Sequence, residues 1–318
     1  MTDLISENIQ QNGHLVLDGA MATELEKRGI ATNTTLWSAT ALRDNPQAII
    51  DVHTSYFKAG ADVAITNSYQ ANVPAFEAAG YTTDEAEEMI TASATLAIKA
   101  RQAYYDGLSN NDRSRRAAHP LVIGSIGPYG AYLADGSEYT GKYDLSQTAF
   151  KDFHRRRMQL LDAAGVDGFA FETQPKFAEV QALVDLLQTE FPTQHAWISF
   201  SINDNGRELW DGTPLSEAVQ AFNDVDQISA IGINCTAMEN IADAVALIKE
   251  YTDKPIIIYP NNGDIYDPAT KTWQENEHAA SFTNLVPLWQ ANGAAIIGGC
   301  CRTTPADIAE ITSVLTDN

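Results

Sequence analysis

Eight short apolar segments recur along this chain, each followed by a segment with helical periodicity, and this alternation restricts the possible folds more than any other feature. The apolar segments are rich in Val, Ile and Ala and are hydrophobic at consecutive positions, which is typical of parallel strands buried on both faces. They are Leu15–Ala20, Asp62–Tyr69, Leu121–Gly127, Val166–Thr173, Ala196–Ile202, Ala230–Cys235, Pro255–Asn261 and Ala295–Cys300.

The segments between these strands carry helix signals. Asn45-Pro46 is typical of a helix start, and Thr82 and Glu85 have the spacing of a capping box. Glycines at 60, 165 and 293 suit the left-handed position just past a helix end. The predicted helices cover 46–59, 82–105, 146–164, 177–191, 215–225, 241–251, 279–291 and 305–315. The polar stretch Ser109–His119 is predicted to be a solvated loop.

Strand and helix alternating eight times predict an α/β fold, a single (β/α)₈ TIM-type barrel. An open, doubly wound sheet is the alternative. No Pro-rich or Ser-rich linker and no block of like charge divides the chain, so residues 1–318 are expected to form one domain.

The net charge of −22, from 42 acidic and 20 basic side chains, would repel a phosphate backbone and disfavours nucleic acid as a partner. No stretch approaches 18 consecutive apolar residues, and the N-terminal segment lacks the pattern of a secretory signal. We therefore expect a cytoplasmic protein without a membrane association. An odd count of three cysteines favours metal binding or catalysis over a disulfide scaffold.

All three cysteines fall at the carboxyl ends of predicted strands, where barrel enzymes have their active sites. Cys235 ends the sixth strand, and Cys300 and Cys301 follow Gly298-Gly299 at the eighth. Three thiolates can occupy three corners of a zinc tetrahedron and leave the fourth for a substrate. Three alternatives remain from position alone: a phosphate-binding glycine loop, a small core residue at Cys235, and a disulfide between Cys300 and Cys301.

Other barrel chemistries find less support. No lysine ends a strand, which disfavours a Schiff-base enzyme, and the six histidines fall mainly in helices or at strand starts. Asp18 and Glu172 both lie at strand ends, so a glycosidase with paired carboxylates stays open as a minor alternative.

Six stretches of the sequence carry motifs of a known family. They are Asp18-Gly19-Ala20-Met21-Ala22-Thr23-Glu24-Leu25, Ser68-Tyr69-Gln70-Ala71, Gly124-Ser125-Ile126-Gly127-Pro128-Tyr129-Gly130-Ala131-Tyr132, Gly232-Ile233-Asn234-Cys235, Tyr259-Pro260-Asn261 and Gly298-Gly299-Cys300-Cys301-Arg302-Thr303-Thr304-Pro305. They resemble the motifs of the zinc-dependent homocysteine S-methyltransferases, and most closely those of the stand-alone bacterial members that use S-methylmethionine. The likeness runs from about residue 14 to residue 310.

The resemblance implies that Cys235, Cys300 and Cys301 bind Zn²⁺ and that the homocysteine sulfur takes the remaining position. It further implies that Asp18 and Glu172 hold the homocysteine ammonium, with Ser125 near its carboxylate and Asn234 also at the substrate site.

The implied reaction is a direct displacement, in which the homocysteine sulfur attacks the methyl carbon of a sulfonium and methionine forms without a protein general base. S-methylmethionine is the expected donor and S-adenosylmethionine a poorer one. Aromatic faces suit such a cation, and the candidates in or near strand-end loops are Trp37, Tyr69, Tyr129 and Tyr132.

Three further hypotheses remain open: betaine as the donor, a different thiol or a selenol as the acceptor, and a non-enzymatic zinc or redox protein. We expect a monomer, because no dimerisation arm follows the eighth strand.

Overall fold

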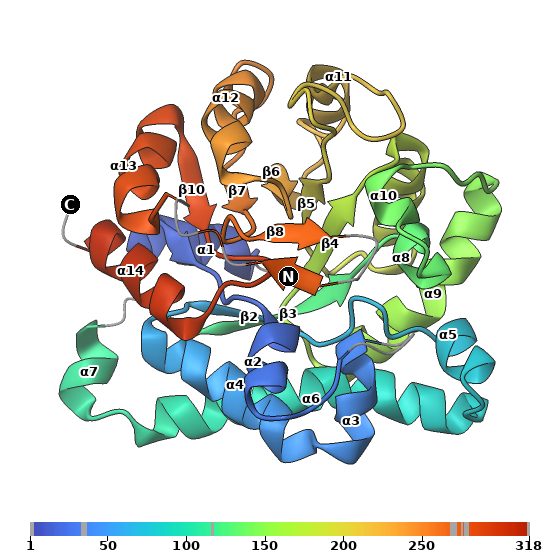
Figure 1. The fold of residues 1–318 in the computed structure, drawn as a ribbon, viewed down its shortest axis with the longest axis horizontal. Coiled ribbons are helices and arrows are strands. Elements are labelled where there is room, and N and C mark those ends of the chain that lie inside the picture. Colours follow the sequence, from blue (N-terminus) through green and yellow to red (C-terminus); the bar gives the residue numbers. More distant parts are fainter. Residues whose placement is uncertain are drawn as a thin grey trace.

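The computed structural model describes residues 3–32, 37–115, 118–267, 272–274, 276 and 280–316. Eight parallel strands form a barrel with the order β1-β10-β7-β6-β5-β4-β3-β2, and helices surround it (Figure 1). The strands are β1 (Leu15–Val16), β2 (Val63–Ile65), β3 (Leu121–Ile126), β4 (Phe169–Gln174), β5 (Ala196–Phe200), β6 (Ile228–Asn234), β7 (Ile256–Tyr259) and β10 (Ala294–Ile297).

The barrel closes where the first strand meets both the last strand and the second. β1 pairs with β10, and Leu17 forms a parallel bridge to Val63 of β2. At this seam the Asp18 N–H donates to the Val63 carbonyl at 3.0 Å. The predicted (β/α)₈ barrel is therefore confirmed, and the open doubly wound sheet is wrong.

The first two strands are shorter than predicted because side chains replace the backbone ladder near their ends. The Ile65 N–H donates to Asp18 Oδ2 at 2.9 Å, and the Ser125 N–H donates to Thr66 Oγ1 at 2.9 Å. These side-chain acceptors satisfy backbone donors that an extended strand would otherwise pair. They also fix Asp18 at the rim of the barrel.

The outer helices follow the predicted pattern closely. They are α4 (Pro46–Ala59), α6 (Thr83–Gly107), α9 (Gln147–Ala164), α10 (Phe177–Glu190), α11 (Leu215–Gln220), α12 (Met238–Lys249), α13 (Phe282–Asn292) and α14 (Pro305–Thr316). Thr82 and Glu85 form the predicted capping box, and Gly60, Gly165 and Gly293 all adopt a positive φ at helix ends. Helix α11 ends five residues earlier than predicted.

Two parts of the hydrophobic core lie on either side of the strands. The larger part packs strand residues against the helices. The smaller part fills the barrel interior and includes Leu17, Trp197 and Ile257. Ile5 of helix α1 (Leu4–Asn12), which the sequence analysis did not predict, joins the interior cluster and approaches Gly168 just before β4. Helix α1 therefore covers the amino ends of the strands, opposite the cysteines.

Further short elements follow the strand ends or lie between the main helices. They are α2 (Met21–Lys27), η1 (Trp37–Thr40), α3 (Ala41–Asp44), α5 (Val73–Ala78), α7 (Asn110–Arg115), α8 (Tyr129–Leu133), η2 (Ser137–Tyr139) and the antiparallel pair β8 (Ile265–Asp267) and β9 (Thr272–Gln274). The prediction of a loop at 109–119 is wrong for α7, because Ser109 Oγ accepts the Asp112 N–H and starts a helical turn. Within the described residues, no helix combines the length and apolar character that crossing a membrane requires.

A buried polar network lies beneath the loops that follow β2 and β3. The Arg157 side chain, which is 2% exposed, donates to the carbonyls of Tyr69 at 2.9 Å and Gly127 at 2.7 Å. It also contacts His154 Nδ1 at 2.8 Å, and His154 Nε2 lies 2.8 Å from Glu179 Oε1. This chain of contacts ties α9 and α10 to two strand-end loops and so fixes the backbone of Tyr69.

Candidate metal centre and active site

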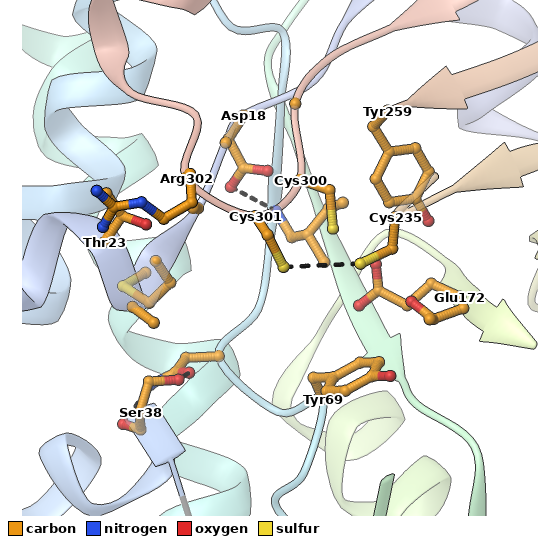
Figure 2. Close-up of a pocket in the computed structure, with 18 of the residues that line it drawn as sticks. Asp18, Thr23, Ser38, Tyr69, Glu172, Cys235, Tyr259, Cys300, Cys301 and Arg302 are labelled. Carbon is orange, nitrogen blue, oxygen red and sulfur yellow. Dashed lines mark hydrogen bonds between the residues drawn. The ribbon is translucent and has the colours of Figure 1, made fainter. Parts of the chain in front are cut away.

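The carboxyl ends of the strands surround a cavity of about 220 Å³, which contains the three cysteines on its wall (Figure 2). Residues from β1, β2, β4, β6, β7 and β10, or from the loops directly after them, contribute to the lining. Those used below are Asp18, Tyr69, Glu138, Tyr139, Glu172, Thr173, Cys235, Tyr259, Cys300, Cys301 and Arg302.

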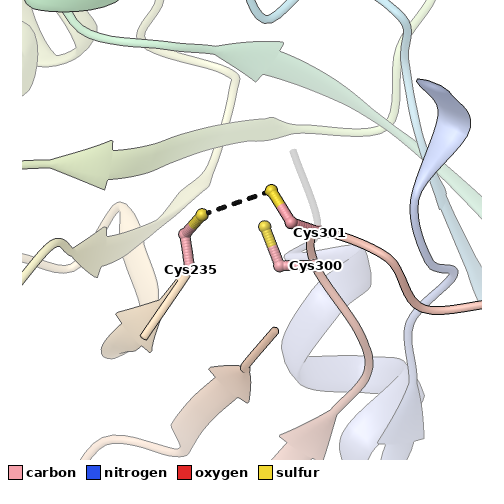
Figure 3. A group of neighbouring side chains, drawn as sticks. All are labelled: Cys235, Cys300 and Cys301. Atoms are coloured by element: carbon pink, nitrogen blue, oxygen red, sulfur yellow. Dashed lines mark hydrogen bonds between the residues drawn. The ribbon is translucent and has the colours of Figure 1, made fainter. Parts of the chain in front are cut away.

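The three cysteine sulfurs converge, as the sequence analysis predicted. All three Sγ atoms lie within 4.8 Å of one another, and those of Cys235 and Cys301 are 3.6 Å apart (Figure 3). All three cysteines are free thiols in this structure. The cluster can hold a metal ion, because three sulfur atoms face one point from two strand ends.

The backbone brings the adjacent Cys300 and Cys301 side chains to the same side because both lie beyond the end of β10. The Cys300 N–H donates to the Pro260 carbonyl at 2.7 Å, and the Cys301 N–H donates to Asn261 Oδ1 at 3.2 Å. A Cβ at Gly298 would lie 2.4 Å from the Leu17 Cβ, and one at Gly299 would lie 2.3 Å from Thr303 Oγ1. The two glycines therefore allow Leu17 and Thr303 to pack closely against this turn.

Cys235 reaches the cluster through an unusual backbone conformation. Its φ is 51°, in the left-handed region that costs a non-glycine residue about 1 kcal/mol. The Cys235 N–H donates to the Tyr259 carbonyl at 3.0 Å, which fixes the turn beside β7. Strain of this kind is common where a side chain must be aimed at a site.

The electrostatics of the cluster favour one thiolate over three. Hydrogen bonds from Cys300 and Cys301 lower the pKa of Cys235 well below its usual value, whereas the shared interaction with Cys235 raises the pKa values of Cys300 and Cys301. Adding further thiolates therefore requires a cation to offset their repulsion, which is what a bound divalent metal provides.

Asp18 and Glu172 line the same cavity, and both are buried. Burial raises the pKa of Asp18 well above its usual range and raises that of Glu172 to about 7, since the charged forms lose water. The nearby Glu172 charge adds to the effect on Asp18. Figure 2 shows Glu172 and Tyr259 beside Cys235. The geometry thus brings together the two carboxylates and the three sulfurs that the sequence analysis singled out.

Ser125 and Asn234 lie behind the cavity and are not among its lining residues. The Ser125 hydroxyl donates to Glu172 Oε1. Asn234 Oδ1 accepts the Thr173 N–H at 2.7 Å, and its Nδ2 donates to Thr173 Oγ1 at 2.8 Å. Both side chains therefore support residues that line the cavity, and neither faces it.

The four aromatic candidates have different positions. Tyr69 lines the cavity, and its ring packs so closely on Gly127 that a Cβ there would lie 2.6 Å from the ring. Tyr129 and Tyr132 lie on α8 and pack against Phe153 of α9, away from the cavity lining. The Trp37 side chain lies outside the described residues.

Several lining residues were missed by the sequence analysis. The Tyr139 hydroxyl lies 3.1 Å from Cys235 Sγ, and Tyr259 is the last residue of β7. Tyr259 could have been found from its strand-end position. Glu138 and Tyr139 come from a loop after β3, and nothing in their spacing distinguishes them from other loop residues.

A buried histidine close to this site gives a prediction about acid stability. His53 of α4 is fully buried, neither of its ring nitrogens has a hydrogen-bond partner among the described residues, and Nδ1 is 3.8 Å from Asp18 Oδ2. Burial lowers the pKa of His53 to about 4. An unfolded histidine titrates near 6.5, so the unfolded state takes up this proton first as the pH falls.

The His53 contribution to folding should therefore be complete above about pH 6.5 and lost by about pH 4, by up to about 3 kcal/mol. Urea unfolding of the wild type and of His53→Leu at several pH values between 7.5 and 4 measures it. The unfolding free energy of the wild type should fall more steeply with acid than that of the variant. Parallel curves would contradict the assignment.

Comparison with known proteins agrees with this geometry. A family profile described as Homocysteine S-methyltransferase matches residues 15–315. Homocysteine S-methyltransferase of Escherichia coli (strain K12) is 49% identical over 298 residues, which are 93% of this chain and 94% of that protein. Homocysteine S-methyltransferase YbgG of Bacillus subtilis (strain 168) is 48% identical over 297 residues, 93% of each chain.

Solved structures give the same result. The crystal structure of the homocysteine methyltransferase MmuM from Escherichia coli, in its metallated form, matches with a TM-score of 0.86 and 44% identity, covering 98% of this chain and 99% of that one. The chain therefore belongs to the homocysteine S-methyltransferase family of enzymes.

Proposed function

We propose that this enzyme transfers a methyl group from S-methylmethionine to homocysteine, that Zn²⁺ is its metal, and that residues 1–318 act as one homocysteine-binding domain. The observation that carries the proposal is the convergence of three cysteine sulfurs on a cavity that also contains buried carboxylates and an aromatic ring.

The cysteine cluster fits zinc by its donor set and its dimensions. A tetrahedral zinc site with Zn–S bonds of about 2.3 Å has sulfur atoms about 3.8 Å apart. The Cys235 and Cys301 sulfurs are 3.6 Å apart in this structure. Sulfur ligands also favour zinc over the hard cations Mg²⁺ and Ca²⁺. Zinc held by Cys235, Cys300 and Cys301 would supply the homocysteine sulfur as a thiolate at neutral pH, whereas a free thiol is only about 3% ionised.

The protein's own residues would bind and orient the substrates. Asp18 and Glu172 would bind the homocysteine ammonium, and such a cation would offset the cost of burying the two carboxylates. Ser125 would act through Glu172, and Asn234 through Thr173, so we propose positioning roles for both. The Tyr69 ring would pack against the cationic donor.

The reaction balances without a protein base. The homocysteine thiol gives its proton to solvent, the sulfur forms a bond to the donor methyl carbon, and the bond from that carbon to the sulfonium sulfur breaks. The bonding pair stays with the leaving sulfur, which becomes a neutral thioether. With S-methylmethionine, two methionines and one proton result. Holding the two sulfurs in line is then the main contribution of the cavity.

A donor-resolved assay tests the proposal. Purified, zinc-loaded protein is given homocysteine with S-methylmethionine, S-adenosylmethionine or betaine in separate reactions, and S-methylmethionine with another thiol or a selenol acceptor in a further one. We expect two methionines per homocysteine with S-methylmethionine, slower turnover with S-adenosylmethionine and little with betaine. Turnover only with betaine, or only with another thiol or selenol acceptor, would reject it. So would the absence of methionine with every donor.

A further inference from the structure

Three buried carboxylates line the cavity, and an oxygen of one of them lacks a hydrogen-bond partner among the described residues. Asp18 accepts the Ile65 N–H, and Glu172 accepts the Ser125 hydroxyl. Glu138 is only 7% exposed, and its Oε2 has no hydrogen-bond partner among the described residues. A buried carboxylate oxygen without a partner is costly, so this atom indicates a ligand group that the free protein lacks.

The position of Glu138 is fixed by its backbone. It lies in η2, which packs against α8 so closely that a Cβ on Gly130 would be 2.7 Å from the Glu138 nitrogen. The next residue, Tyr139, has its hydroxyl 3.1 Å from Cys235 Sγ. Glu138 therefore belongs to the part of the cavity nearest the sulfurs, and a ligand that meets its carboxylate lies close to the reacting atoms.

Glu138 comes from a different strand-end loop than Asp18 and Glu172, since it lies in η2 after β3. Glu172 raises the pKa of Asp18, which shows that these two groups lie near each other. Burial raises the pKa of Glu138 to about 7, and the charges that add to this effect come from Cys235 and Asp135. One substrate ammonium between Asp18 and Glu172 would leave Glu138 Oε2 without a partner.

The charges of the two substrates match this arrangement. Homocysteine brings one ammonium, whereas S-methylmethionine brings an ammonium and a sulfonium. Among the described residues that line the cavity, Arg302 alone has a cationic side chain, and its Nε bonds to Asp264 Oδ2 at 3.1 Å. The described lining residues thus leave Glu138 without a cation of its own, and the methyl donor would bring one.

We propose that Glu138 is the specificity residue for the methyl donor and pairs with its sulfonium group. This inference rests on the proposed function, because it takes the donor to be a sulfonium. The pairing is strongest before reaction, since the positive charge disappears as the methyl group moves to the thiolate. Glu138 therefore strengthens donor binding and does not accelerate the chemical step.

Glu138→Gln tests the proposal because it keeps the shape and removes the charge. We expect the KM for S-methylmethionine to rise about 10-fold to 50-fold, as for the loss of a charge-assisted contact. The kcat and the KM for homocysteine should change less than about 2-fold. Asp135→Asn is the matched control, since it removes a charge from the same loop outside the cavity and its Oδ1 can still accept the Ser137 N–H.

Calorimetric binding to the zinc-loaded protein separates the sulfonium from the rest of the donor. Methionine has the same ammonium and carboxylate as S-methylmethionine but a neutral sulfur. In Glu138→Gln, the Kd of S-methylmethionine should rise by the same 10-fold to 50-fold, and that of methionine should change less than 2-fold. Equal weakening of both ligands would overturn the proposal, as would a loss confined to kcat or to the KM for homocysteine.

The wild-type protein distinguishes a failure of the proposed function from a failure of the role proposed for Glu138. If the wild type uses no sulfonium donor, both the proposed function and the role of Glu138 fail. If the wild type uses S-methylmethionine and Glu138→Gln has unchanged donor kinetics while remaining folded and metal-loaded, only the role of Glu138 fails. A thermal unfolding curve and a metal analysis of each variant supply those two checks.

Discussion

Cys301→Ala is expected to lose the metal and at least about 10³-fold in activity. Without the third sulfur the cluster keeps only Cys235 and Cys300, too few to close a structural or catalytic zinc site. The homocysteine thiol would then lose about 30-fold in ionisation at neutral pH, and a further factor on the order of 10² in positioning. Elemental analysis and turnover, both measured with the metal in excess, check the expectation.

Tyr139→Phe is the control for metal binding. It removes the hydroxyl that lies 3.1 Å from Cys235 Sγ but leaves all three sulfurs in place. This variant should keep the metal content of the wild type. A Cys301→Ala protein with a full complement of tightly bound metal, or with wild-type turnover, would show that the cluster is not the metal site.

Arg157→Met is expected to lower the free energy of unfolding by about 3–5 kcal/mol. The methionine can occupy the space of the arginine stem but cannot donate to the carbonyls of Tyr69 and Gly127. The substitution also leaves His154 and the buried Glu179 carboxylate without the neighbouring cation. Burial lowers the pKa of Arg157 to about 10, so the side chain is still charged at neutral pH. Denaturant unfolding at pH 7.5 measures the loss.

Arg156→Met is a matched control from the adjacent position. The Arg156 side chain is 51% exposed and pairs with Glu87 on the surface, so its loss should cost less than about 1 kcal/mol. Similar losses for the two variants would mean that the buried network contributes nothing beyond an ordinary surface ion pair. Because Arg157 fixes the Tyr69 backbone, we also expect Arg157→Met to weaken donor binding in whatever fraction remains folded.

The sequence predicted the barrel and the convergence of the cysteines because both depend on regular features. Apolar strands alternating with helices admit few packings, and the carboxyl ends of parallel strands meet at one rim. Any residue directly after a strand is thereby placed at that rim. Cys235, Cys300, Asp18 and Glu172 were found in this way, without knowledge of any side-chain contact.

A position at a strand end does not specify whether the side chain there lines the cavity. Ser125 and Asn234 point into the barrel, in phase with the interior residues Ile123 and Ala230. Their hydrogen bonds place them beneath Glu172 and Thr173, which line the cavity in their stead. Tyr129 and Tyr132 follow β3, yet the chain forms α8 there and packs their rings on Phe153.

The position of Glu138 at the cavity could not be predicted from the sequence, for a different reason. Its place depends on positive φ values at Ala134 and Gly136 and on close packing against Gly130. Such contacts arise from the folded loop, and the local sequence pattern does not specify them.

The two strands that bear the cysteines are not neighbours, since β7 lies between β6 and β10. The distance from Cys235 to Cys301 is consequently set by two interstrand registers, and a slip of one residue would move a sulfur by roughly 3.3 Å along the strand direction. Metal affinity in this enzyme should therefore depend on the register of β6, β7 and β10. Substitutions inside β7 that do not contact the ion should still change that affinity.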